Sequence, residues 1–196
     1  KKINKSLLLK KLSFIINKKT FINKSLFCSV VPNKFLLIKS FLQKDLKIKT
    51  IELKNLNLNK IMKIKVNRKQ IGSDRLANSI AVISKKKNYI ILDFGTATTF
   101  DVVIGNIYRG GVIAPGLDIS AEALWNRAAR LPRIEIGLPQ KVIGTSTVDS
   151  MQSGLYYGYL SLVDGILEQM QRELEVAEVI GTGGISHSRQ IQGFNR

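Results

Sequence analysis

The sequence predicts an α/β or α+β fold, of the kind that handles nucleotides, rather than a helical bundle. Three observations lead to this expectation. Apolar strands joined by tight turns are followed by amphipathic helices, and this succession occurs twice. The chain has 196 residues, of which 44% are hydrophobic, and this is ample for a packed core. Its composition also changes abruptly near residues 85–90, where we expect a domain boundary.

In the first half, apolar residues recur at helical spacing in three segments, which are expected to be helices: residues 4–22, 34–46 and 71–85. Residues 25–31 are rich in β-formers and stop at Pro32, which disfavours helix before it. A polar, Asn-rich stretch follows the second helix through Lys60. The third helix is entered through Gly72-Ser73-Asp74, and Asp74 is a candidate N-cap.

In the second half, short apolar runs bounded by small residues predict four strands: residues 89–92, 100–105, 107–109 and 177–180. Helical spacing predicts two helices, over residues 118–130 and 154–175. Residues 93–99 are expected to form a turn of small residues between the first two strands. Residues 181–184, Gly-Thr-Gly-Gly, are expected to form a turn after the last strand.

The positive charge is concentrated in the first half. Residues 1–92 hold 23 basic and 3 acidic residues and residues 93–196 hold 8 and 11, within a formal net charge of +17. Clustered basic residues can bind nucleic-acid phosphates. The excess is Lys mixed with Ile and Asn, however, and includes only Arg68 and Arg75, whereas base readout relies on Arg. Drift of an AT-rich genome explains it better, and a nucleic-acid partner is the least favoured alternative.

Single residues of two reactive types limit the possible chemistry. Cys28 is the only cysteine and His187 the only histidine, so neither an intrachain disulfide nor a His-rich metal site is expected. A reducing, cytoplasmic setting follows. Lysines interrupt every apolar run before it reaches the length of a membrane helix, and they also interrupt the apolar part of residues 1–19, which argues against a signal peptide.

The segment from Asp93 to Thr99 is a candidate phosphate-binding loop. Asp93 ends an apolar strand and is followed by Gly95, Thr96, Thr98 and Thr99. Unobstructed backbone N–H groups and hydroxyls suit the oxygens of a phosphate chain, and the carboxylate can hold a cation that neutralises them. An ordinary polar turn in a hairpin is the alternative.

The tetrapeptide Gly72-Ser73-Asp74-Arg75 is a candidate substrate site. It opens a helix, so its amides favour an anion, while Arg75 can clamp a carboxylate and Asp74 can deprotonate a hydroxyl. The alternative is an Asp N-cap beside a solvated Arg. Thr147 similarly either donates to a ligand or caps the helix after it. The turn at residues 181–184 either contacts phosphate or adenosine or is a plain connection.

Several motifs in this order resemble those of the type III pantothenate kinases: Cys28-Ser29-Val30-Val31-Pro32, Gly72-Ser73-Asp74-Arg75-Leu76-Ala77-Asn78, Asp93-Phe94-Gly95-Thr96-Ala97-Thr98-Thr99-Phe100-Asp101 and Gly110-Gly111-Val112-Ile113-Ala114-Pro115-Gly116-Leu117. The resemblance extends over residues 25–185. It implies the acetate and sugar kinase, actin and heat-shock chaperone superfamily, an α/β architecture in which two ribonuclease-H-like (actin-like ATPase) domains close on ATP. The expected domains are residues 1–88 and 89–196.

The resemblance also implies roles for individual residues. Asp74 matches the catalytic proton acceptor, and Gly72, Ser73 and Arg75 match the substrate-binding residues around it, although the family more usually has Ala where Ser73 stands. Asp93 matches the ligand of a monovalent metal ion or ammonium, typically potassium. Gly95 and Thr96 belong to the loop that contacts ATP. Thr147 matches a threonine that contacts pantothenate.

The function implied by the resemblance is a transferase of coenzyme A biosynthesis. Such a kinase phosphorylates pantothenate to 4'-phosphopantothenate with ATP and magnesium, as a cytoplasmic homodimer. Two departures are expected to matter. Residues 1–24 contain no strand followed by the family's D-x-G-N-T phosphate loop, and residues 187–196 lack an apolar helix, so we expect a chain truncated at both ends. An inactive or accessory, regulatory relative that has lost this loop is the alternative.

Overall fold

The computed structural model describes residues 4–16, 22–29, 31–174 and 176–184. The chain forms two compact units, Lys1–Ala81 (unit 1) and Val82–Arg196 (unit 2). Helices and strands occur in both, so the fold is mixed α/β, as the sequence predicts. Within the described residues, no helix is both long enough and apolar enough to span a lipid bilayer.

The described residues of unit 1 form three α-helices and three short strands: α1 (Lys5–Ile16), β1 (Lys24–Phe27), α2 (Pro32–Ser40), β2 (Lys49–Glu52), β3 (Lys63–Ile64) and α3 (Ser73–Ala81). Strands β1 and β2 pair in parallel, with Lys24 opposite Lys49. A small core of Leu8, Phe41 and Leu42 ties α1 to the chain that follows α2. That chain, Phe41–Asp45, is a π-helical turn, and 3-10 turns form at Leu53–Asn55 and Arg68–Gln70.

Several predicted boundaries in unit 1 were wrong. Strand β2 lies in the stretch predicted to be merely polar, because Lys49–Glu52 gains its partner β1 from 25 residues upstream. Helix α3 ends at Ala81 rather than at residue 85, and Ser84 instead donates its backbone N–H to the carbonyl of Gly105 at 3.3 Å. Part of the predicted helix over residues 4–22, residues 17–21, lies outside the described residues.

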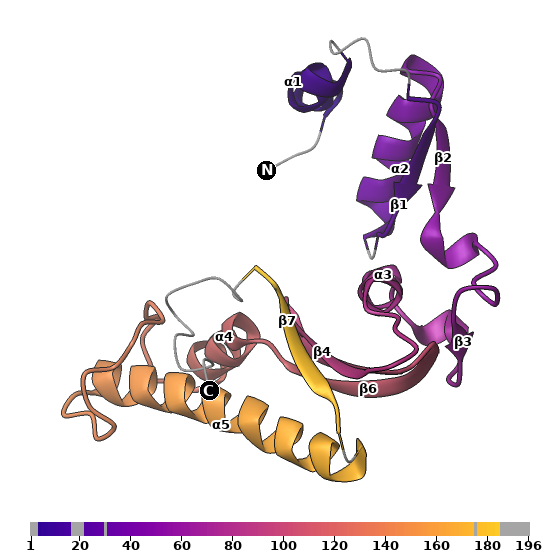
Figure 1. Cartoon of the computed structure of the whole chain (residues 1–196). Coiled ribbons are helices and arrows are strands. Elements are labelled where there is room, and N and C mark those ends of the chain that lie inside the picture. Colours follow the sequence, from indigo (N-terminus) through magenta and orange to yellow (C-terminus); the bar gives the residue numbers. More distant parts are fainter. Residues whose placement is uncertain (1–3, 17–21, 30, 175, 185–196) are drawn as a thin grey trace. The chain divides into compact units, whose positions relative to one another are not determined.

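Unit 2 is built on a meander of three antiparallel strands, β4 (Asn88–Phe94), β5 (Ala97–Ile104) and β6 (Ile107–Pro115). Strand β7 (Glu178–Gly183) joins it in parallel beside β4, which gives the order β6-β5-β4-β7. Two helices, α4 (Leu117–Arg127) and α5 (Thr147–Leu174), pack on one face of this sheet (Figure 1).

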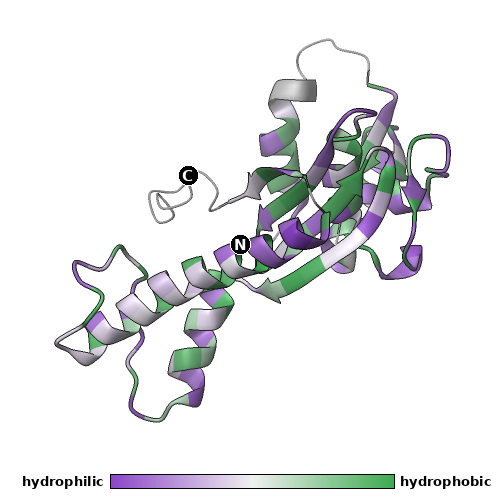
Figure 2. Cartoon of the chain, turned by 60° about the horizontal axis from the view of Figure 1, so that its bottom comes forward, coloured by the Kyte–Doolittle hydropathy of each residue, from purple (hydrophilic) through white to green (hydrophobic). Residues whose placement is uncertain are grey.

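The core of unit 2 lies between this face and the two helices. Alternate residues of β4 and β5 point into it, as the period of two in a strand requires. They pack with side chains of α4 and α5 in one cluster: Ile90, Leu92, Phe94, Phe100, Val102, Leu117, Ala121, Leu155, Tyr159 and Val163. In Figure 2 the strands are accordingly the most continuously apolar part of the chain.

The strands of unit 2 are longer than predicted, and the turns are shorter. Asp93 and Phe94 belong to β4 and Thr98 and Thr99 to β5, so the loop predicted over residues 93–99 is a tight hairpin whose turn is Gly95 and Thr96. The cause is cross-strand pairing, since Asp93 faces Thr99 and Phe94 faces Thr98. Gly181, Thr182 and Gly183 likewise lie within β7 rather than in a turn after it.

Candidate functional site

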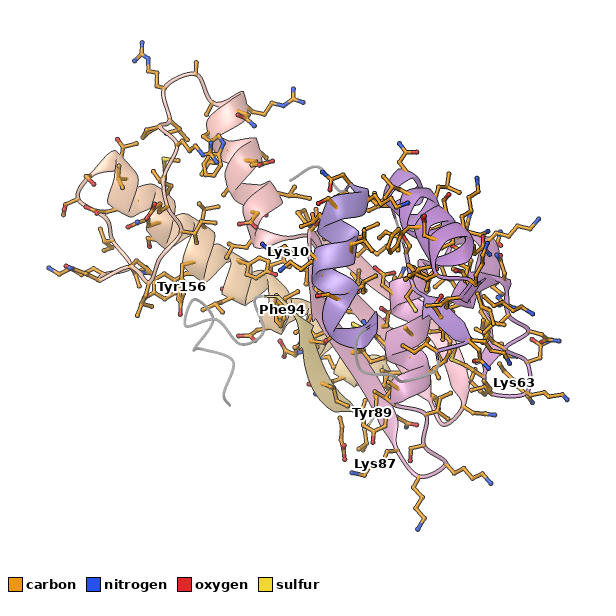
Figure 3. All side chains as sticks on the ribbon, turned by 90° about the horizontal axis from the view of Figure 1, so that it is seen from above. Lys10, Lys63, Lys87, Tyr89, Phe94 and Tyr156 are labelled. Carbon is orange, nitrogen blue, oxygen red and sulfur yellow. The ribbon has the colours of Figure 1, made fainter. Side chains whose placement is uncertain are left out.

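The first candidate site of unit 2 lies where β4 and β7 end. These strands are parallel, and Asp93 near the end of β4 is level with Thr182 of β7. In Figure 3, Phe94 marks this end of β4, and Lys87 and Tyr89 mark the other. Ligands of α/β sheets bind preferentially at the carboxyl ends of parallel strands. The half-buried Asp93 carboxylate is therefore well located for a ligand.

Gly183 lies where β7 approaches Asp93 and Phe94 too closely to admit a side chain. A Cβ atom on this residue would lie 2.6 Å from Oδ1 of Asp93 and 2.6 Å from the carbonyl oxygen of Phe94. Gly183 also has a φ of +98°, which side-chain-bearing residues rarely adopt. Two oxygens, one of them charged, thus converge beside β7, and oxygen donors are the ligands that hard cations prefer.

The hairpin turn of Gly95 and Thr96 packs against the start of α4. Gly116 is the N-cap residue of this helix, and a Cβ atom there would lie 2.3 Å from the Thr96 carbonyl and 2.7 Å from that of Gly95. The positive end of the α4 dipole is thus beside the exposed turn, an arrangement that favours an anion. Sequence reasoning missed Gly116 as a site residue. A glycine is needed here because the backbone of the hairpin turn comes close to the start of α4, and no local sequence pattern reveals such a contact.

Two buried tyrosines hold β5 on its opposite faces. On the helix side, the hydroxyls of Thr98 and Tyr159 share a hydrogen bond of 2.6 Å. Burial raises the pKa of the Tyr159 phenol. The hydrogen bond with Thr98 lowers this pKa and the charge of Asp118 raises it further, but both effects are smaller than that of burial. On the other face, the Tyr108 hydroxyl donates to the buried carboxylate of Asp101. Sequence reasoning missed both pairs; an Asp inside an apolar strand was the available signal.

Unit 1 holds the second candidate site, at the start of α3. Asp74 is the second residue of the helix rather than its N-cap, because the helix begins at Ser73. Its exposed carboxylate accepts a hydrogen bond of 2.8 Å from the backbone N–H of Arg75 through Oδ1. Burial and, to a smaller extent, the charge of Asp74 raise the pKa of the Cys28 thiol.

Ser73 is the most enclosed residue of this tetrapeptide. It is only 2% exposed, and its hydroxyl has no hydrogen-bond partner among the described residues. Leaving a hydroxyl buried and unpaired costs folding free energy.

Thr147 begins α5 and does not cap it. The Ser146 hydroxyl accepts the backbone N–H of Asp149 at 3.1 Å, which makes Ser146 the cap. Thr147 is exposed, beside a cavity of about 350 Å³ lined by Thr145, Asp149, Gln152 and residues of the preceding loop. The first turns of α5 extend beyond the sheet (Figures 1 and 2), so Thr147 is not part of the cluster around Asp93.

The structure therefore groups the predicted site residues in three places. Asp93, Gly95 and Thr96 lie together at one end of the unit 2 sheet. The tetrapeptide of residues 72–75 forms the first turn of α3 in unit 1, and Thr147 begins α5. No cluster of three or more His, Cys, Asp or Glu side chains suited to a metal occurs in the described part of the chain.

A family model and several curated relatives point to the same family. The family model of type III pantothenate kinase matches residues 3–169. The type III pantothenate kinase of Pelagibacter ubique (strain HTCC1062) is 52% identical over 187 residues, which cover 95% of this chain and 75% of that protein. The type III pantothenate kinase of Koribacter versatilis (strain Ellin345) is 56% identical over 123 residues, 61% of this chain and 45% of that protein.

The chain thus spans three quarters of the first relative and about half of the second. A solved structure from Campylobacter jejuni, described as belonging to the Baf family of transcriptional activators, superposes with a TM-score of 0.54. It is 18% identical and covers 89% of this chain and 73% of its own, and at this identity it supports the fold alone. The sequence matches decide the family: the chain belongs to the type III pantothenate kinases.

Proposed function

We propose that this chain phosphorylates pantothenate to 4'-phosphopantothenate with ATP and magnesium, a step of coenzyme A biosynthesis. Membership of the family carries the proposal. The end of the unit 2 sheet supports it, because an acidic residue, a small-residue turn and a helix N-terminus converge there. Phosphoryl transfer needs such positioning and electrostatic stabilisation more than covalent chemistry.

ATP binds in this proposal at the hairpin turn of Gly95 and Thr96. The amides at the start of α4 and the Thr96 hydroxyl donate to phosphate oxygens. Asp93 holds a monovalent cation, potassium or ammonium, together with the Phe94 carbonyl, and the convergence of these two oxygens beside Gly183 supports this assignment. When bound, the cation offsets phosphate charge.

Pantothenate binds at residues 72–75. It has a carboxylate, which Arg75 pairs with, and a primary hydroxyl, which is the phosphoryl acceptor. Asp74 accepts the proton of this hydroxyl as its oxygen attacks the γ-phosphorus, and the bond from the γ-phosphorus to the bridging oxygen breaks, which releases ADP. Its hydrogen bond from the Arg75 N–H engages Oδ1, and Oδ2 takes the proton.

Thr147 contacts pantothenate from a second copy of the chain. Its distance from the Asp93 cluster within unit 2 supports this arrangement, and so do exposed apolar side chains around the start of α5: Leu138, Val142, Ile143 and Val148. We therefore propose a cytoplasmic homodimer of two ribonuclease-H-like domains per chain, residues 1–88 and 89–196. Sedimentation at micromolar concentration tests the oligomeric state, and a monomer would remove Thr147 from the substrate site.

The decisive experiment is formation of phosphopantothenate from labelled pantothenate and ATP. It is run on the 196-residue chain and on a version extended upstream with a D-x-G-N-T segment, each with an Asp74→Asn control. ATP-dependent product from either version, lost in its control, supports the proposal. Absence of product from both versions, at concentrations where ATP binding is measurable, contradicts it and favours an accessory, non-catalytic role.

A further inference from the structure

A buried carboxylate on β5 is left unused by the proposed reaction. Asp101 is 0% exposed in the middle of the strand. The Tyr108 hydroxyl donates to its Oδ1 at 2.6 Å, and the Thr99 hydroxyl donates to its Oδ2 at 3.2 Å. The first distance falls in the range of charge-assisted O–H···O bonds. Burying a carboxylate is costly unless such hydrogen bonds compensate it, and the two hydroxyls supply them here.

The register of the sheet connects this cluster to Asp93. Thr99 and Asp101 are two residues apart on β5 and therefore lie on the same face. Asp93 is the direct cross-strand partner of Thr99 and shares that face. The order Tyr108, Asp101, Thr99, Asp93 thus crosses three adjacent strands, β6, β5 and β4.

The hydrogen-bond directions assign a role to Thr99. Because its hydroxyl proton is committed to Asp101, the lone pairs of its oxygen point elsewhere and remain available as acceptors. Oxygen acceptors are what a monovalent cation beside Asp93 requires. We propose that Asp101, anchored by Tyr108, is a positioning residue that orients Thr99 as an additional oxygen ligand of the cation at Asp93. This inference rests on the cation site of the proposed function.

The test compares two tyrosines whose hydroxyls form hydrogen bonds on opposite faces of β5. Tyr108→Phe removes the hydroxyl that anchors Asp101, and Tyr159→Phe removes a bond of the same length, 2.6 Å, on the core face. The thermal midpoint is measured with ATP and magnesium but without pantothenate, while KCl replaces NaCl at constant ionic strength. Ligand that binds the folded state raises this midpoint in a saturable way, so no turnover is needed.

Both variants are expected to lower the midpoint, but only Tyr108→Phe should raise the potassium concentration for half-maximal stabilisation, by about tenfold. Thr99→Val should raise it similarly, and the double variant should be no worse than Thr99→Val alone, since Tyr108 acts through Thr99. Three results would each overturn the inference. The half-maximal potassium concentration could be unchanged in Tyr108→Phe, the effects of Tyr108→Phe and Thr99→Val on it could add in the double variant, or potassium could fail to stabilise the wild type.

Failure of the inference and failure of the proposed function give different results. A wild type that forms phosphopantothenate but shows no Tyr108-dependent potassium response retains the proposed function and loses the inference. A wild type that forms no product, yet responds to potassium through Tyr108 and Thr99, retains the inference and loses the proposed reaction.

Discussion

At the start of α3, the Ser73 hydroxyl is buried with no described hydrogen-bond partner. A serine therefore costs stability at a position where the resemblance suggests that Ala is usual. We predict that Ser73→Ala raises the free energy of unfolding by about 1 kcal/mol, because it removes an unpaired buried hydroxyl without creating a large cavity. Urea unfolding measures this. A destabilised variant would show that the hydroxyl has a partner in solution.

The neighbouring Asp74 is exposed, and its variant should affect chemistry rather than folding. Asp74→Asn in an active form should lower kcat about 10²–10⁴-fold, the usual loss for a general base, and leave ATP binding unchanged. Cys28 provides a local control. Because the Asp74 charge helps to raise the pKa of this thiol, its alkylation at fixed pH should become faster in the variant. Near-normal turnover would exclude Asp74 as the proton acceptor.

Tyr159 gives the fold a defined dependence on alkaline pH. Its pKa is raised chiefly by burial, so the folded state keeps the phenolic proton after the unfolded chain has lost it. This stabilisation is complete below pH of about 10, the pKa of an unperturbed tyrosine, and disappears as the pH rises through the folded value. Urea unfolding from pH 9 to 11.5 should show a smaller loss of stability in Tyr159→Phe. Equal losses would contradict the assignment.

Among the elements, the β4–β5 hairpin is closely approached by two glycines that lie outside it, Gly183 of β7 and Gly116 before α4. We predict that Gly183→Ala destabilises unit 2 and abolishes cation binding at Asp93, because its Cβ would lie 2.6 Å from both a carboxylate and a carbonyl oxygen. Gly158→Ala is the matched control, since nothing lies within 4 Å of its Cβ and α5 should gain about 0.5–1 kcal/mol. Thermal unfolding of the two variants tests this contrast. A Gly183→Ala protein as stable as the wild type would show that Gly183 lies farther from Asp93 and Phe94 in solution.

The sequence allowed most elements to be predicted, but not where they end. Helix α5 and the meander follow from periodicity and turn residues, which are local properties of the chain. Strand β2, the short hairpin turn and the inclusion of Gly181 in β7 depend on pairing with distant residues, which no local pattern reveals. The same distinction applies to the site. Asp74 and Asp93 stand out by residue type and neighbours, whereas the Thr98–Tyr159 bond joins residues 61 positions apart.

For the molecule as a whole, the two units differ greatly in charge. Unit 1, residues 1–81, holds 20 of the 31 basic and 3 of the 14 acidic residues, so it carries the entire formal charge of +17, while unit 2 is formally neutral. Lys10 and Lys63 (Figure 3) are among the exposed lysines of unit 1. Its ion pairs, Lys5–Asp45 and Lys54–Glu52, involve two of its three acidic residues, so most of this charge has no local counter-charge. Unit 1 must therefore fold against electrostatic self-repulsion.

This repulsion makes the stability of the protein dependent on salt. The Debye length falls from about 30 Å at 0.01 M to about 8 Å at 0.15 M, so added NaCl should screen the lysines of unit 1 and raise the thermal midpoint. Replacing Lys10 and Lys11, which are exposed on α1, by Gln should raise the midpoint at low salt and reduce its dependence on NaCl. Arg109→Gln, an exposed change in the neutral unit 2, is the control and should alter that dependence little.

A midpoint that does not respond to NaCl would mean that bound anions already neutralise unit 1. Titration with a DNA duplex at low and high salt would then be the next measurement, because salt-sensitive binding would favour the nucleic-acid alternative.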